Sequence, residues 1–549
     1  MKQTLLWLFS LLVLVSCARV GSPIGGDRDT IAPKMIGFNL DSARINVPTT
    51  TKELKIDFDE YILLKDISKN LIISPPIKYT KIIPSSLGSK YLLIQWKDSL
   101  LANTTYNFNF GNSIVDLNES NVLPYFNFAF STGEKIDDLY ISGVISDAIG
   151  NEKNSEGKDK NYVVGLYQVK DSMDFRQKPY YITKADPDGY YELNYLTPGK
   201  YKIIGFDDEN GNSIYDSGKE AISFIKDEID LNTSISGLKL KSYPAKKSVK
   251  YKELEAVQGG LMMTFEGKPD KVSVKRVGEK PLDYQTTHKS KSDSVRIWFD
   301  VEKENIGATV SENLKFSYDT GIKRDTVSIF YRKATNNEMS VNMVENKIVP
   351  QGNFILSSDY IINRIQPENW KLESDSIAQK FTVKILESDS TRIVINSNFV
   401  AGKKYELTVP KNTVTSLYNK ISQSKRFDFE VGKAEDYGSF TVNIANVPKN
   451  KFWIQLLNDR NEPAYQIYTD DSKVSFENLK PGTYKLRILV DNNSNGIWDS
   501  NDFANETFAE DVYLYKKQDS KDLMSKISIR PMWEINENWD LNLEEQPIN

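Results

Sequence analysis

Short stretches in which apolar and polar residues alternate recur along most of the chain after position 30. Residues 54–58, 106–110 and 126–130 have this pattern, and residues 405–409 and 427–431 show it again. A period of two directs one face of a strand to a core and the other face to water. We find no amphipathic stretch of three or more helical turns between these segments, so the sequence predicts an all-β chain.

Two long segments of the sequence are copies of one another. Residues 196–202 (LTPGKYK) match residues 479–485 (LKPGTYK), and the string 208–216 (DENGNSIYD) returns at 491–499 (DNNSNGIWD), 283 positions later. A second pair of copies is separated by 299 positions, which is the distance from Tyr106 to Tyr405 and from Gly133 to Gly432. Repetition on this scale indicates a chain built from duplicated β-modules.

The repeats divide the chain into five predicted β-domains. They are sandwich A at 30–136, module B at 137–242, middle domain C at 243–335, sandwich A′ at 336–433 and module B′ at 434–517. Residues 518–549 form a predicted polar tail that either docks one more strand on B′ or binds a partner. We expect these tandem β-sandwich domains to form a rod-like or folded-back chain.

Length and charge fit this organisation and exclude some partners. A chain of 549 residues is too long for one core, so roughly four to five domains are expected. Its 70 Lys and Arg residues nearly balance 75 Asp and Glu residues, and this balance gives no support to nucleic-acid binding.

The N-terminus has the features of a bacterial lipoprotein. A short positive start and an apolar run at 5–15, too short to span a bilayer, predict a signal peptide at 1–16. The residues before Cys17 resemble the lipobox, which implies a covalent lipid on this Cys; an incidental Cys is the alternative. Residues 17–29 would be a tether to the outer membrane. Acidic residues come only at Asp27 and Asp29, so the side of the membrane stays open.

Several segments of the mature chain resemble known families. Residues 29–33, 56–61, 70–76 and 128–133 resemble the bacterial Ig-like domain of the SbsA type, as found in outer-membrane lipoproteins of Bacteroidota. The Leu-x-Pro-Gly-x-Tyr string of B and B′ is similar to carboxypeptidase-regulatory-like, or transthyretin-like, β-sandwiches. The resemblance implies tandem Ig-like and transthyretin-like sandwiches, although Ala32 stands where the family usually has a second Pro.

The repeated strings have the spacing of calcium-binding loops, with oxygen-bearing side chains at alternate positions. The predicted ligands of the second loop are Asp491, Asn493, Asn495, the Ile497 carbonyl, Asp499 and Asp502. Those of the first loop are Asp208, Asn210, Asn212, the Ile214 carbonyl and Asp216. The first loop has Lys219 at its twelfth position, although Glu220 is adjacent, so we expect weaker binding there. The alternative is an Asn- and Gly-rich turn that satisfies its own backbone. Calcium would act as a structural clamp.

The sequence gives little support for catalysis. His288 is the only His and lies in a polar run predicted to be an exposed loop, and Cys17 is assigned to lipid. A carboxylate-pair hydrolase is a minor alternative. Tyr180, Tyr181, Tyr190 and Tyr191 could stack on a glycan, but aromatic residues in sandwiches more often pack in cores.

We therefore predict a non-catalytic outer-membrane lipoprotein that acts as a scaffold or interaction subunit of an envelope protein complex, with assembly or export of outer-membrane proteins as one possible setting. The alternative function is a surface glycan-binding protein or adhesin.

Overall fold

A computed structural model describes residues 29–154, 157–171, 173–278, 280–304, 306–307, 311–332, 338–517, 520 and 522–542. Across these residues nearly all regular structure is β-strand, so the all-β prediction is confirmed. The short exceptions are α2 (Ile67–Asn70), α3 (Val301–Glu304), η1 (Pro367–Asn369), η2 (Ala434–Asp436) and η3 (Phe503–Asn505). The predicted signal peptide and lipid site at Cys17 lie outside the described residues, as does most of the tether. No described helix is long and apolar enough to cross a bilayer.

Domain A consists of two antiparallel sheets, β1-β2-β5-β4 with β7 added to β2, and β3-β6-β8. Its strands are β1 (Met35–Phe38), β2 (Glu53–Leu64), β3 (Ile72–Ser74), β4 (Tyr79–Ile83), β5 (Ser89–Trp96), β6 (Thr105–Gly111), β7 (Ile114–Asp116) and β8 (Phe126–Ser131). Alternate residues of β6 and β8 point inward, and Phe108 stacks on Phe130 at a centroid distance of 5.9 Å. Burial of such a side chain stabilises the domain by about 1.5–3 kcal/mol.

Domain A′ repeats this sandwich with sheets β24-β26-β31-β30 and β25-β34-β32-β28-β29, and a β27-β33 pair. Its strands are β24 (Val341–Met343), β25 (Lys347–Ile348), β26 (Phe354–Ser358), β27 (Ile362–Ile365), β28 (Lys371–Ser374), β29 (Ile377–Ala378), β30 (Phe381–Leu386), β31 (Asp389–Ser397), β32 (Lys404–Val409), β33 (Val414–Ser416) and β34 (Lys425–Val431). The Tyr106 hydroxyl accepts a 2.8 Å hydrogen bond from the Leu101 amide, and Tyr405 accepts the same bond from Val400. This shared detail supports the duplication inferred from the 299-residue spacing.

Modules B and B′ have one topology. In B the sheets are β12-β9-β16 and β11-β10-β13-β14, with β15 on β13; in B′ they are β38-β35-β42 and β37-β36-β39-β40, with β41 on β39. The strands of B are β9 (Leu139–Asp147), β10 (Tyr162–Gln168), β11 (Tyr181–Lys184), β12 (Tyr190–Leu196), β13 (Gly199–Asp207), β14 (Ile222–Phe224), β15 (Ile229–Leu231) and β16 (Ile235–Ser242). Those of B′ are β35 (Gly438–Ala445), β36 (Phe452–Leu457), β37 (Pro463–Thr469), β38 (Lys473–Leu479), β39 (Gly482–Val490), β40 (Val512–Leu514), β41 (Lys526–Ile529) and β42 (Glu534–Asp540).

The segment separated as a tail in the sequence is part of B′. Strand β42 pairs in parallel with β35 over seven residues, as β16 pairs with β9 in B, and Trp539 is buried in the B′ core. The docked alternative therefore holds, and the boundary drawn at residue 517 cuts through the module. The sequence left both alternatives open because B′ has a longer segment between β39 and β42 than B has between β13 and β16.

Domain C contains the sheets β17-β18-β21-β20 and β19-β22-β23, and a hydrophobic core separate from those of its neighbours. Its strands are β17 (Lys250–Val257), β18 (Gly260–Glu266), β19 (Ser273–Val277), β20 (Tyr284–His288), β21 (Ser294–Phe299), β22 (Glu312–Asp319) and β23 (Arg324–Tyr331).

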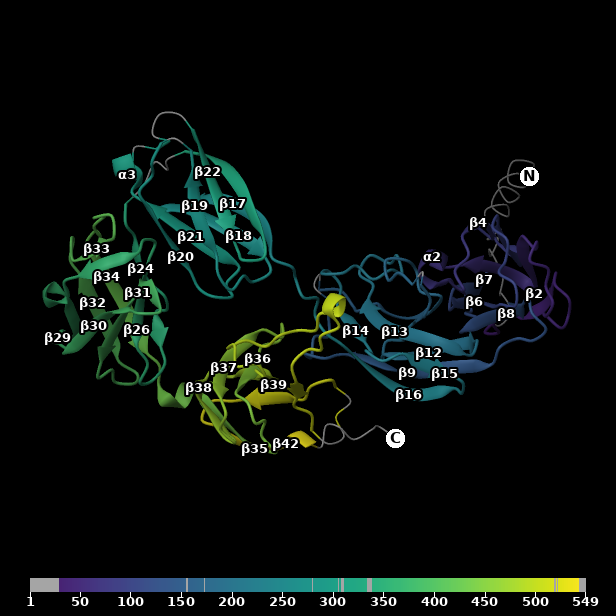
Figure 1. Ribbon diagram of the computed structural model, residues 1–549. Coiled ribbons are helices and arrows are strands. Elements are labelled where there is room, and N and C mark those ends of the chain that lie inside the picture. Colours follow the sequence, from purple (N-terminus) through teal and green to yellow (C-terminus); the bar gives the residue numbers. More distant parts are fainter. Residues whose placement is uncertain are drawn as a thin grey trace, which may run out of the picture.

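The chain folds back on itself, so that the yellow-green B′ lies beside the blue B and domain A projects from the far side of B (Figure 1). The Tyr418 hydroxyl of A′ donates a 2.8 Å hydrogen bond to the Trp298 carbonyl of C. The Asn478 side chain of B′ donates to the Pro350 carbonyl of A′ at 3.3 Å. Because B′ also contacts B, the domains B, C, A′ and B′ form a closed ring.

Candidate functional site: two calcium-type loops at the B–B′ junction

The first loop follows β13, where Asp208 is buried at the end of the strand. Its carboxylate accepts hydrogen bonds from the amides of Asn212 (3.0 Å) and Ser213 (2.9 Å). The Asn212 side-chain oxygen accepts the Ile214 amide at 2.6 Å, and the Asn210 side-chain amide donates to Asp216. These bonds bring the five predicted residues of the loop together.

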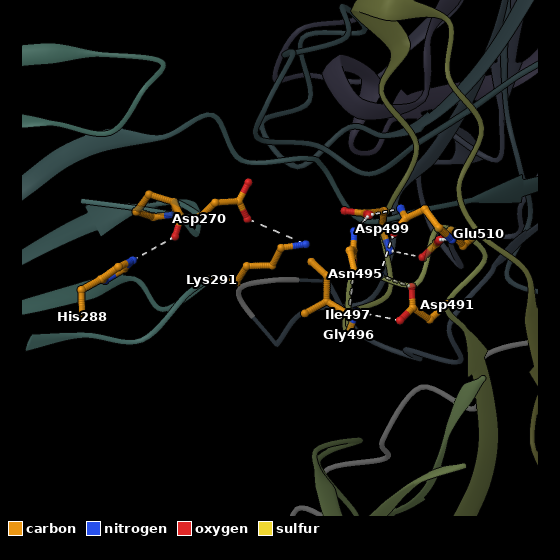
Figure 2. A network of polar contacts seen from close by, with 11 residues as sticks. Asp270, His288, Lys291, Asp491, Asn495, Gly496, Ile497, Asp499 and Glu510 are labelled. Carbon is orange, nitrogen blue, oxygen red and sulfur yellow. Dashed lines mark hydrogen bonds and ion pairs between the residues drawn. The ribbon is translucent and has the colours of Figure 1, made fainter. Parts of the chain in front are cut away.

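The second loop follows β39 and repeats these contacts (Figure 2). The Asp491 carboxylate accepts the amides of Asn495 (2.9 Å) and Gly496 (2.7 Å). The Asn495 side-chain oxygen accepts the Ile497 amide at 2.9 Å. Gly496 has a φ of +82°, and Ser213 in the first loop takes the same left-handed conformation with a φ of +61°. The missing Gly of the first loop therefore does not change its path, although a side chain at this φ is strained.

A glutamate that lies outside each motif completes each loop. Glu220 accepts the amides of Glu209 (3.1 Å) and Asp216 (2.9 Å), and Glu510 accepts those of Asn493 (3.1 Å) and Asp499 (2.8 Å).

The assignment of Asp502 as a ligand of the second loop is wrong. Its carboxylate instead receives the Lys246 ammonium at 3.1 Å and the Asn505 side-chain amide at 2.9 Å. The physical reason is an extension of the chain. Glu220 follows Asp208 by 12 positions, but Glu510 follows Asp491 by 19, so seven extra residues carry Asp502 away.

Each loop contains three carboxylates, which accept hydrogen bonds from amide groups of that loop. None of the six forms an ion pair with a Lys, Arg or His in the described part of the chain. Burial, together with the charges of Asp208 and Asp216, raises the pKa of Glu220 to about 7. Burial and the charges of Asp499 and Asp491 also raise the pKa of Glu510. Both glutamates therefore lie in environments that disfavour further negative charge.

Asp491 behaves differently from these glutamates. Burial opposes its ionisation, but hydrogen bonds from the Tyr468 hydroxyl (2.7 Å) and from the Gly496 and Asn495 amides outweigh burial and lower its pKa. The negative charge of this first-position carboxylate is therefore stabilised by the loop amides together with Tyr468 on β37.

The donor set suits a hard cation, since carboxylate, amide and backbone oxygens are what calcium prefers. Two observations favour the alternative of a self-satisfied turn. The side-chain amides of Asn493 and Asn495 donate to Asp499 at 2.8 and 2.6 Å. Among the described residues, no three His, Cys, Asp or Glu side chains converge as a metal cluster. Calcium in either loop remains a prediction.

The seven-residue extension of the second loop packs against B. Phe503, on η3, contacts Phe175 at a centroid distance of 4.8 Å, Phe224 at 5.2 Å and Tyr215 at 5.6 Å. The Asn501 side chain donates to the Ile222 carbonyl at 3.0 Å. The extension therefore completes a hydrophobic cluster on the outer face of a B sheet.

The aromatic residue at the eighth position of each loop reaches the opposite copy. Tyr215 of the first loop contacts Phe503 of B′, and Trp498 of the second loop stacks on Tyr243, which follows β16 of B, at 6.2 Å. The shapes of both loops consequently position the B–B′ junction.

B contacts B′ in return through the segment after β9. The guanidinium of Arg487, on β39, is buried and donates to the Ile149 carbonyl and the Gln455 side chain, both at 2.8 Å. Lys485 forms a 2.6 Å ion pair with Glu152. Burial lowers the pKa of Arg487 to about 10, whereas the charge of Asp147 opposes this shift.

Domain C also approaches the second loop. Figure 2 shows the Lys291 side chain directed toward Asn495 and Ile497, while its ammonium lies 3.8 Å from Asp270. His288 ends strand β20 and is partly buried, so its assignment to an exposed loop is wrong. Its ring nitrogens lie 3.0 and 3.2 Å from the carbonyl oxygens of Ser294 and Pro269. The ring therefore connects two segments of domain C.

The tyrosines considered for glycan stacking mostly belong to the core of B. Tyr181 and Tyr191 are buried and Tyr180 is partly buried, whereas Tyr190 is exposed and donates its hydroxyl to Glu192. A stacking platform would therefore have to rest on Tyr190 alone among these four residues.

Residues 29–132 match the family model of a bacterial Ig-like domain. None of the curated proteins matches the chain in sequence. Among solved structures, the chain is similar to domains 1–6 of the surface layer protein SbsC (9% identity, 90% of this chain and 68% of that chain covered, TM-score 0.15).

It is also similar to BcpA, the major pilin subunit of Bacillus cereus (10% identity, 74% and 99% covered, TM-score 0.13). A third is SGBP-B of Bacteroides ovatus in complex with a mixed-linkage heptasaccharide (11% identity, 69% and 95% covered, TM-score 0.20). At these values the likenesses say nothing about what this chain binds. Sandwich A thus has a bacterial Ig-like fold, and the whole chain is a tandem array of β-domains.

Proposed function

We propose that this protein is a non-catalytic, lipid-anchored outer-membrane protein that acts as a scaffold or interaction subunit of an envelope protein complex, with assembly or export of outer-membrane proteins as one setting. The closed ring of B, C, A′ and B′ is the observation that carries the proposal. Side-chain contacts join A′ to C and B′ to B, for example Tyr418 to Trp298 and Arg487 to Ile149. A ring of this kind presents fixed surfaces to partners and leaves domain A to face the anchor.

Affinity purification of the tagged full-length protein in mild detergent tests this function. We expect at least one envelope protein to copurify in a fixed ratio, and its loss when A is deleted or when the ring is opened by Phe503→Ala. A protein that purifies alone under several mild detergents would contradict the scaffold role. Protease treatment of intact and permeabilised cells will show which side of the membrane the domains face.

We also propose that calcium is a structural clamp at the B–B′ junction. Each loop has the calcium-type spacing of oxygen-bearing side chains and contains three carboxylates, and the aromatic residue at the eighth position of each loop contacts the opposite copy. Binding of a cation would offset the repulsion between the carboxylates and tighten the junction. The clamp has no role in signalling, because the loops are flanked by strands of a rigid sandwich and not by movable helices.

A further inference from the structure

One end of domain A carries large apolar side chains that face water. Leu87, at the tip of the β4–β5 hairpin, is 82% exposed, and Tyr61 on β2 is 51% exposed. Leu117 and Val122 follow β7, and Ile31 lies near the start of the described chain; all three are also exposed. We call these five residues the A-domain patch.

The patch is held together by contacts between its segments. A methyl group placed on Gly88 would lie 3.0 Å from the Leu117 side chain, so Leu117 lies over the residue next to Leu87. The Leu117 amide donates to the Tyr61 carbonyl at 2.9 Å, and Val122 bridges to Val115 on β7. Leu87, Tyr61, Leu117 and Val122 therefore lie on neighbouring segments at one end of the domain. A group of exposed apolar side chains of this kind marks a place of contact with a partner or a membrane.

The chain enters domain A beside this patch. The Asn121 side-chain amide, adjacent to Val122, donates to the Asp29 carbonyl at 3.0 Å. Cys17 lies 12 positions before Asp29. Since an extended chain spans at most ~3.6 Å per residue, the patch lies within roughly 40 Å of whatever holds Cys17.

We propose that the A-domain patch rests on the membrane surface, with Leu87 and Tyr61 in the interfacial region of the bilayer. This inference rests on the proposed lipid anchor at Cys17. The length and starting point of the preceding chain favour lipid over a distant protein partner. The pairing of Tyr61 with Lys90, whose ammonium lies 5.5 Å from the ring centroid, suits an interface that is apolar on one side and wet on the other.

Charge around the patch indicates which lipid surface fits. Asp29, Asp59 and Glu119 lie near Glu60, and burial together with these neighbours and Asp116 raises the pKa of Glu60. A group of carboxylates next to the patch is repelled by anionic headgroups. The patch therefore suits a zwitterionic surface, such as one of phosphatidylethanolamine and phosphatidylcholine.

A single fluorescent label can test this contact in the full-length acylated protein. Because Cys17 is the only Cys and its thiol would carry the proposed lipid, Leu87→Cys supplies one free thiol for an environment-sensitive dye. Ile322→Cys is the matched control, since Ile322 in domain C is also 82% exposed. Both proteins are placed in zwitterionic nanodiscs, with and without lipids that carry a spin-label quencher on the acyl chain.

We expect a blue-shifted emission that is quenched by the spin-labelled lipid at position 87, and a water-like, unquenched emission at position 322. Anionic lipid should weaken the quenching at position 87. Emission at position 87 that matches position 322 in membrane-bound protein would overturn the inference. So would a blue shift that needs a copurified protein and shows no lipid quenching.

Flotation with liposomes reports separately on the anchor. Protein that floats but keeps position 87 in water refutes only the patch contact. Protein that fails to float refutes the anchor and, with it, the inference.

Discussion

The loops at 208–216 and 491–499 share a sequence pattern and nearly the same internal hydrogen bonds, but they contribute differently to the molecule. In both, an aspartate at the first position accepts the amides of the fifth and sixth positions. In the first loop the chain then returns directly to β14. In the second loop seven more residues leave the turn and insert Phe503 into B.

The difference shows how a duplicated module acquires an asymmetric role. B offers the apolar outer face of its sheet, with Ile204 and Phe206 on β13. At the matching positions of β39, B′ has Arg487 and Leu489, and the arginine is buried by the segment of B that follows β9. Each copy therefore covers the outer sheet face of the other, but through different segments and different chemistry.

Arg487→Ala should weaken the junction most. The Ile149 carbonyl would lose its buried charged donor and a void would replace the side chain, so we expect the junction to lose about 2–3 kcal/mol. Native-state hydrogen exchange of β39 and of residues 148–152 measures this local opening. Arg426→Ala is the control, because its side chain is exposed on the surface of A′ and should change exchange little. Equal effects of the two variants would show that the contact of Arg487 with B contributes nothing.

Phe503→Ala should open the same junction from the other side. The ring is partly buried against three aromatic side chains of B, so its loss should cost about 2 kcal/mol. Small-angle scattering should then report a larger radius of gyration. Phe508→Ala serves as a control, since Phe508 stacks on Phe224 but is largely exposed. An unchanged scattering curve for Phe503→Ala would mean that other contacts close the ring.

Much of this architecture could be predicted from the sequence, because strand alternation and repeated motifs report local structure. The period of two in residues 106–110 and 405–409 correctly predicted matching strands, β6 and β32. The five loop residues 208, 210, 212, 214 and 216 were found for the same reason: one turn brings them together.

The contacts that the sequence did not show depend on distant segments. Glu510 completes the second loop because the chain comes back to the loop after an extension of seven residues. The twelfth position of the calcium-loop motif is Asp502, whose carboxylate contacts Lys246 instead. The extension itself carried a signal, since it breaks the 283-residue spacing of the repeat. Docking of the tail as a strand on B′ was one of two alternatives that the sequence left open, and the pairing of β42 with β35 decides between them.

Removal of calcium should affect the second loop more than the first. At a tenfold excess of calcium over the dissociation constant, binding adds about 1.4 kcal/mol to the free energy of unfolding. We expect calcium to raise the melting temperature and Asp491→Ala to remove much of the rise, with a smaller loss for Asp208→Ala. Asp502→Ala should leave the rise intact, since its carboxylate points to Lys246. A melting curve that does not change on chelation would refute the clamp.

The smallest expected effect concerns the side chain that faces the first aspartate of each loop. Strand pairing places Tyr468 of β37 where B has Lys184 of β11. Tyr468 donates a neutral hydroxyl to Asp491 at 2.7 Å. Burial lowers the pKa of Lys184, and the nearby negative charge of Asp208 opposes this shift. A cation beside the first loop competes with calcium, which gives a physical reason for weaker binding there.

Lys184→Gln should therefore bring the first loop closer to the second. Loss of the competing charge should increase the calcium affinity of that loop about twofold, which corresponds to ~0.4 kcal/mol. Isothermal titration in an Asp491→Ala background isolates the first loop and measures the change. Lys200→Gln, an exposed lysine on β13, is the matched control and should leave the affinity unchanged. An equal change in calcium affinity for the two variants would show that the net charge of the protein, and not a cation facing Asp208, causes the difference in affinity between the loops.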